Sequence, residues 1–142
     1  MLSGPVESSR LPPHLCEPLL HVRPLWPDAG TPSERTARRL CELAALAVAG
    51  AFEVPLGELH ASTRRDRPVA FARQVAMYLA HVSFGLTYTA IGHAFGRDRT
   101  TAAHACRLVE ERRDDPAAEA LLTSLENTCS MLRLRLSKAV PS

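Results

Sequence analysis

The sequence is poor in the features that mark several common classes of protein. Aromatic residues make up 5% of its 142 residues, too few for the exposed rings on which single-stranded nucleic acids stack. The N-terminus lacks the basic segment followed by an apolar run that marks a signal peptide. No apolar stretch is long enough to cross a membrane. We therefore expect a cytoplasmic protein with reduced thiols.

The four cysteines are widely spaced, and no Cys-x-x-Cys pair occurs. A structural zinc site needs close pairs of ligands, and a disulfide framework is expected in secreted chains. His14, Cys16 and His21 are ligand-type residues, but their irregular spacing is more typical of chance. We predict neither a metal nor a cofactor.

Motifs for catalysis are also missing. The sequence contains no G-x-x-x-x-G-K-[ST] phosphate loop, no G-x-S-x-G and no H-E-x-x-H. His104 and Cys106 lie two positions apart on a predicted helix, so they point to different faces and cannot form a base–nucleophile pair. The sequence favours a binding protein over an enzyme.

Positive charge is concentrated in one part of the chain. The formal net charge is only +2, yet residues 60–113 contain nine arginines and four acidic residues, a local excess of five positive charges. Such clustering is typical of phosphate-binding surfaces, although arginines are also common on any solvated surface.

The segments before residue 60 differ in their helix signals. Residues 1–31 contain six prolines, which predicts an extended or disordered arm. Thr31-Pro32-Ser33-Glu34 predicts a helix start capped by the threonine, and Gly50 is placed to end that helix. Residues 54–59 have room for one short helical turn, because a proline and a glycine interrupt them.

The next segment is a basic loop with Arg64, Arg65 and Arg67, and Pro68 can start the helix that follows. Phe71, Val75, Tyr78 and Leu79 form its apolar stripe. Arg73 and Gln74 fall near its beginning on the polar side. There they are either DNA backbone contacts or ordinary solvated residues, two interpretations that the residues alone leave open.

Residues 86–107 have the pattern of a helix-turn-helix. We expect a support helix over residues 88–95 with Thr87 as its cap. Gly96 can reverse the chain, and Asp98 can cap a recognition helix over residues 99–113. Its inward side is predicted to consist of Ala102, Ala105, Cys106 and Val109. Its outward side is predicted to consist of Arg99, Thr100, Ala103, His104 and Arg107.

Asp115-Pro116 predicts one more helix start, and the helix that follows is rich in leucine. Its leucines could pair two copies in a weak homodimer, but we prefer that the helix packs on its own core in a monomer. We thus predict an all-α helical bundle that contains a helix-turn-helix. It divides into the proline-rich arm (1–31), the helix-turn-helix domain (32–113) and a C-terminal amphipathic helix and tail (114–142).

Three runs of residues carry a family resemblance: Phe71-Ala-Arg-Gln-Val-Ala-Met-Tyr-Leu-Ala80, Ile91-Gly-His-Ala-Phe-Gly-Arg-Asp-Arg-Thr-Thr101 and His104-Ala-Cys. In order and nearly in spacing they resemble the C-terminal DNA-binding domain of the bacterial replication initiator DnaA, over roughly residues 35–113. The resemblance implies the same all-α fold and duplex DNA as partner. The nucleotide-binding motor domain of the family is absent from this sequence.

The resemblance also implies residue roles. Arg65 matches the family's minor-groove arginine, with Arg64 and Arg67 beside it. Arg73 and Gln74 match its backbone contacts. The remaining positions that match or neighbour its recognition helix and turn are Arg97, Asp98, Arg99, Thr100, Thr101, His104 and Arg107.

The sequence departs from the family in two places. The turn has one glycine, Gly96, where the family usually has two, and a one-residue deletion can retilt the recognition helix. Arg99 replaces a histidine, and arginine prefers guanine O6 and N7. We expect a nucleoid-associated DNA-binding protein in replication or transcription control. The alternative is an interaction module that binds a replication-control protein and not DNA.

Overall fold

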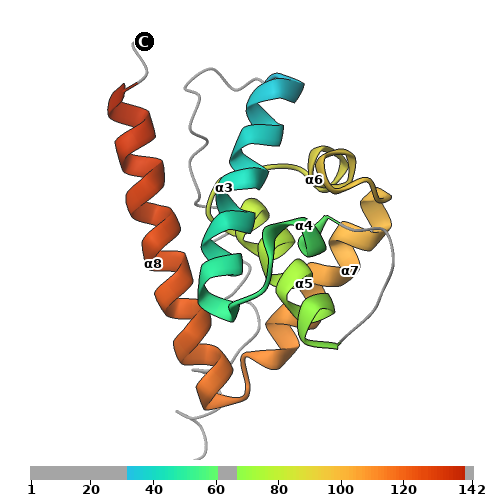
Figure 1. Cartoon of the computed structure of the whole chain (residues 1–142). Coiled ribbons are helices and arrows are strands. Elements are labelled where there is room, and N and C mark those ends of the chain that lie inside the picture. The colour runs from blue at the N-terminus through green and yellow to red at the C-terminus, as the bar shows by residue number, and fades with distance from the viewer. Residues whose placement is uncertain (1–31, 61–66, 140–142) are drawn as a thin grey trace, which may run out of the picture.

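A computed structural model describes residues 32–60 and 67–139 of the chain, and the side chains of 32–60 and 68–136. These residues form six helices and no strand, which confirms the prediction of an all-α fold with a helix-turn-helix (Figure 1). The helices are α3 (Glu34–Phe52), α4 (Leu56–Leu59), α5 (Arg67–Val82), α6 (Tyr88–Phe95), α7 (Arg99–Arg112) and α8 (Pro116–Ala139). The arm predicted over residues 1–31 lies outside the described residues.

The ends of α3 differ from the prediction. Its cap is Ser33 and not Thr31, because the Ser33 hydroxyl accepts the N–H of Thr36 at 3.1 Å and so satisfies a free donor of the first turn. The helix also continues past Gly50 to Phe52, whose ring packs edge-on against Phe71 with centroids 5.8 Å apart. Packing of the last turn therefore overrides the helix-ending tendency of Gly50.

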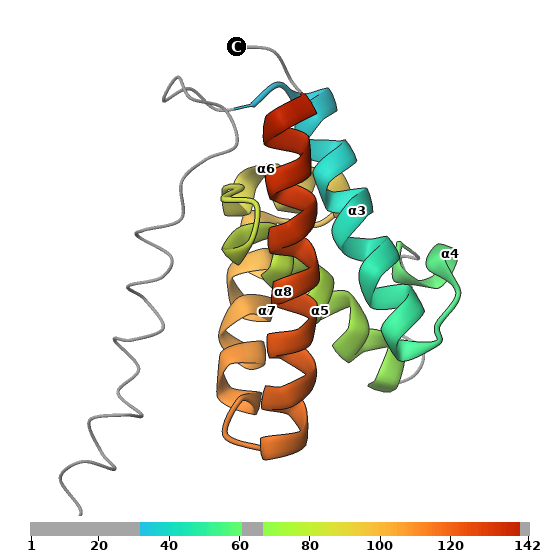
Figure 2. The same cartoon turned by 90° about the vertical axis from the view of Figure 1, so that its left-hand side faces the viewer.

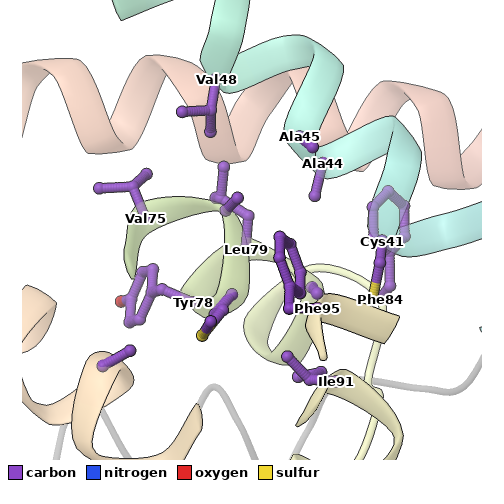
Figure 3. Close-up of a cluster of buried hydrophobic side chains, with 14 of the residues drawn as sticks. Cys41, Ala44, Ala45, Val48, Val75, Tyr78, Leu79, Phe84, Ile91 and Phe95 are labelled. Atoms are coloured by element: carbon purple, nitrogen blue, oxygen red, sulfur yellow. The ribbon is translucent and has the colours of Figure 1, made fainter. Parts of the chain in front are cut away.

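Helix α5 is the centre of the fold and contacts every other described helix. From residue 72 to residue 80, only Gln74 is not fully buried. Figure 3 shows Val75 and Leu79 of α5 facing Val48 of α3. A helix that is enclosed on all sides is a core helix, so α5 has no broad polar side of the kind expected for Arg73.

Helices α6 and α7 form the predicted helix-turn-helix. Thr87 caps α6 by accepting the N–H of Ala90 at 3.1 Å. Gly96 ends α6 in the left-handed conformation, with φ of 68°, as predicted. The inward residues of α7 are buried, as predicted, and are Ala102, Ala105, Cys106 and Val109.

The turn packs directly against Gly92 of α6. The N–H of Arg97 donates to the Gly92 carbonyl at 2.7 Å. A Cβ at Gly92 would lie 2.7 Å from the Arg97 carbonyl oxygen and 2.9 Å from the Asp98 carbonyl carbon. The backbone that leads into α7 thus occupies the space that a side chain at residue 92 would need.

Helix α8 begins at Pro116 after the predicted cap, since the Asp115 carboxylate accepts the N–H of Ala118 at 3.0 Å. Leu122, Leu125 and Cys129 are buried in the common core. Figures 1 and 2 both show α8 running alongside α3 in the opposite direction. The packing of α8 on the chain's own core agrees with the prediction for this helix, whereas the monomeric state stays a prediction.

Arg113 joins the end of α7 to α8 and α5. Its Nε donates to Glu119 at 2.6 Å, and its Nη1 donates to Glu126 at 2.6 Å and to the Tyr78 hydroxyl at 2.9 Å. Burial alone would lower the pKa of Arg113, but the hydrogen bonds to Glu119 and Glu126 outweigh burial and raise it. The arginine is a permanent cation that ties three helices together.

Candidate nucleic-acid interface

A groove of about 580 Å³ lies between α5 and α7. Its lining residues are Ala70, Arg73, Gln74, Met77, Arg97, Thr100, Thr101, His104, Ala105 and Leu108. Six of these were predicted as site residues, and they come from α5, the turn and the first half of α7. The fold therefore brings together predicted residues that lie up to 31 positions apart in the sequence, from Arg73 to His104.

The groove is suited to an anionic or polar ligand. Its lining contains two arginines, one histidine, two threonine hydroxyls and one amide, and none of the ten lining residues is acidic. Arginines and hydroxyls are the groups that contact phosphate oxygens and base edges in protein–DNA interfaces. The apolar residues in its lining come from both helices.

The exposed face of α7 continues from this groove. Arg99, Thr100, His104 and Arg107 are exposed, and Ala103 between them is half-buried. They lie at spacings of three and four residues and so share the outward side that the sequence predicts. The helix is thus packed on one side and presents polar and basic side chains on the other.

Asp98 takes the N-cap position of α7, but in a different manner from the one predicted. Its carbonyl accepts the N–H groups of Thr101 at 3.1 Å and Ala102 at 3.3 Å, whereas its side chain makes no capping hydrogen bond. The prediction of Asp98 as the cap residue is therefore confirmed, but the side-chain hydrogen bond typical of such a cap is not formed. The carboxylate remains exposed at the N-terminus of α7.

Arg73 differs most from its predicted environment. Only 5% of the residue is exposed, so the prediction that it lies on a polar helix side is wrong. Its Nε donates to the Leu59 carbonyl at 2.9 Å, and its Nη2 donates to the Glu58 carbonyl at 3.1 Å. The physical reason is the central place of α5, which packs against α4 at this point.

The other predicted residues differ in how much of them the structure describes. Gln74, Arg97 and Thr101 are half-buried at the groove. Arg67 is the first residue of α5, and its side chain lies outside the described residues, as do Arg64 and Arg65 altogether.

Two further arginines of the basic region have structural contacts. Arg113 is held by Glu119 and Glu126, and Arg112 lies over the ring of Phe71 at 4.6 Å. Because two carboxylates pair with Arg113, the count of nine arginines overstates the positive charge that this region presents, whereas the exposed Arg112 keeps its charge.

Sequence reasoning missed the apolar residues that complete the groove. Ala70 and Met77 flank Gln74 at helical spacing on α5, and Ala105 and Leu108 follow Thr101 at helical spacing on α7. Their periodicity was visible in the sequence, but the crossing of the two helices was not. Only the crossing makes these stripes face each other.

The buried cysteines are unreactive. Burial raises the pKa of the Cys41 and Cys106 thiols to about 12 and that of Cys129 to about 11. At neutral pH these thiols stay protonated, and the thiolate is the nucleophile and the metal ligand. Within residues 32–60 and 67–139 no cluster of three metal-ligand side chains occurs, and no helix there could span a membrane.

The family described as the bacterial dnaA protein helix-turn-helix matches residues 42–109 of this chain. The chromosomal replication initiator protein DnaA of Chromobacterium violaceum is 43% identical over 86 residues, which cover 56% of this chain and 18% of the relative. The DnaA protein of Azoarcus sp. (strain BH72) is 45% identical over 67 residues, which cover 46% of this chain and 14% of the relative. The chain thus spans less than a fifth of the length of these relatives.

The fold has a counterpart among solved structures. A crystal structure of a DNA replication initiation factor is similar with a TM-score of 0.61 and 30% identity, over 68% of this chain and 30% of that one. The segment matched by the family contains the turn at Gly96, most of α7 and the residues that line the groove beside it. Residues 42–109 of this chain therefore match the helix-turn-helix domain of the bacterial replication initiator DnaA in both sequence and fold.

Proposed function

We propose that this protein binds duplex DNA sequence-specifically through α7 and the groove between α5 and α7, and that it acts in the control of replication or transcription. The observation that carries the proposal is the continuity of two features on one surface. The acid-free groove, with Arg97 and His104 in its lining, adjoins the exposed N-terminal face of α7. Relatives of the matched domain are named chromosomal replication initiators, which supports the replication context.

Helix α7 has the dimensions and side chains of a recognition helix. An α-helix with its side chains is about 10–12 Å wide, and the major groove of B-DNA is about 12 Å wide. Arg99 and Thr100 are exposed in the first turn of α7, and His104 is exposed one turn later. In the proposed complex these three side chains contact base edges.

In the proposed complex the groove residues contact the DNA backbone. Gln74 and Arg97 flank the first turn of α7 from α5 and from the turn. Contacts of this kind fix the register of a helix on the duplex without reading its sequence. Arg65, by its match to the family, probes the adjacent minor groove with Arg64 and Arg67 beside it.

Replacing Arg99 by alanine tests the assignment of base readout. A bidentate arginine–guanine contact is worth about 1–3 kcal/mol of discrimination. We expect Arg99→Ala to flatten the preference at one base pair by this amount while non-specific binding changes little. The preference is measured by titrating the selected site and its single-base variants.

Arg107→Ala is the matched control, because Arg107 is exposed on the same side of α7, about one turn after His104. It should lower affinity for all sequences alike. An unchanged base preference in the Arg99 variant would refute the readout by that residue.

A further inference from the structure

The arginine-rich segment 61–66 is bounded by two fixed points. It leaves the end of α4 at His60 and enters α5 at Arg67. The segment itself lies outside the described residues, so the inference concerns only the residues at its first end. Besides the burial of Leu59 in the common core, two side-chain contacts hold these residues to the rest of the domain.

The first contact is the guanidinium of Arg73. It donates to two successive carbonyls of α4, Leu59 at 2.9 Å and Glu58 at 3.1 Å. Carbonyls at the end of a helix lack partners within the helix, and an arginine fork can satisfy two of them at once. With 5% of the residue exposed, this contact is protected from competing water.

The second contact is a ring stack at the last residue before the segment. The imidazole of His60 lies against the ring of Phe95, with centroids 5.1 Å apart and planes at 15°. Phe95 is the last residue of α6 and directly precedes the turn at Gly96. The end of α4 is therefore fastened both to α5 and to the helix-turn-helix.

We propose that Arg73 is a positioning residue for DNA binding, which fixes the place from which the basic segment leaves the domain beside the recognition helix. The inference rests on the proposed function. A phosphate contact by Arg73 would require only its positive charge. Positioning requires the fork that reaches both carbonyls, which a lysine cannot reproduce.

The test is a double-substitution cycle that combines Arg73→Lys with Arg65→Ala. Arg65→Ala alone should lower affinity for a selected duplex roughly tenfold or more. In the Arg73→Lys background the same change should lower the affinity by only about twofold, because the end of α4 that precedes the segment is no longer held by the arginine. Gln74→Ala is the matched control on the same helix, and its effect should multiply with that of Arg65→Ala.

The outcomes separate this inference from the proposed function. Coupling of Arg65 to Arg73 but not to Gln74 supports the positioning role, since a general loss of stability would not act on Arg65 alone. Suppose instead that the effects of Arg73→Lys and Arg65→Ala are independent, and that Arg73→Lys keeps the affinity and salt dependence of the wild type. That result would overturn the positioning role in favour of a phosphate contact by residue 73. Absence of duplex binding by the wild type would overturn both proposals.

A second variant serves if Arg73→Lys does not fold. His60 is exposed, so His60→Ala loosens the same end of α4 without disturbing a buried charge. It should reduce the effect of Arg65→Ala in the same direction. A full effect of Arg65→Ala in a folded His60→Ala protein would contradict the positioning role.

Discussion

Replacing Gly92 by alanine is expected to lower the affinity for duplex DNA at least tenfold and to destabilise the domain by about 1–2 kcal/mol. The new Cβ would lie 2.7 Å from the Arg97 carbonyl oxygen and 2.9 Å from the Asp98 carbonyl carbon, both backbone atoms. Overpacking of a tight contact costs about 1–3 kcal/mol, and the better helix propensity of alanine returns up to about 1 kcal/mol.

The effect on DNA should exceed the effect on stability because of where the displaced backbone leads. Arg97 and Asp98 connect directly to the first turn of α7. If they move to admit a methyl group, the recognition helix tilts with them. Small displacements of a positioned helix remove bidentate contacts, each worth about 1–3 kcal/mol.

Gly50→Ala is the matched control for Gly92→Ala. Gly50 lies inside α3, and a Cβ there would meet no atom within 4 Å. That change should stabilise the domain by about 0.5–1 kcal/mol and leave DNA binding unaltered. The two variants are compared by thermal unfolding and by duplex titration. Wild-type affinity in Gly92→Ala would show that the turn does not set the tilt of α7.

Replacing Arg113 by alanine is expected to destabilise the domain by about 2–3 kcal/mol without weakening DNA binding by the folded protein. Breaking a buried ion pair costs about 3–5 kcal/mol. The value here is smaller, because the side chains of Glu119 and Glu126 are 47% and 25% exposed, whereas that of Arg113 is 12% exposed. The Tyr78 hydroxyl also loses its partner.

Thermal unfolding measures this loss. In a domain of about 100 residues each kcal/mol shifts Tm by about 4–8 °C, so we expect a decrease of about 10–20 °C. Arg107→Ala removes the same charge from an exposed position and should change stability by less than about 0.5 kcal/mol. If the two variants unfold at the same temperature, the Arg113 network does not hold α7, α8 and α5 together.

Acid should weaken the same network. The hydrogen bond from Arg113 lowers the pKa of Glu119 below its ordinary value of 4.5. In the pH range between the lowered pKa and 4.5, the unfolded chain binds more protons than the folded one. This contribution to stability is therefore complete above the ordinary pKa and is lost as the pH falls through the lowered one. Arg113→Ala should remove this part of the acid sensitivity.

The sequence predicts the helices and the site unequally. Signals confined to a few residues, such as the caps at Thr87 and Asp115 and the left-handed Gly96, give the helix boundaries correctly. Gly50 does not end α3, because the packing of Phe52 on Phe71 lies outside the local sequence. Local chemistry therefore succeeds where tertiary packing does not compete with it.

The buried and exposed faces of α7 were predictable, because the helical period of about 3.6 residues alone decides which of its residues share a face. The place of Arg73 was not, since it depends on α4 and on the four other helices that pack against α5. A short helix such as α4 has little periodicity to show which carbonyls need a donor. The turn after Gly96 was also not predictable from the sequence. It fits against Gly92 through backbone atoms, and a side-chain pattern does not show such a contact.

The central claim is duplex binding by this surface, and the most direct test titrates a labelled duplex with the whole chain at two salt concentrations, with and without Arg65→Ala. We expect binding at low salt that weakens as salt rises, with log affinity falling by about 0.9 per phosphate contact for each unit of log salt. The Arg65 variant should bind more weakly than the wild type. Absence of binding at low salt would contradict duplex binding by this surface and favour a module that binds protein in place of DNA.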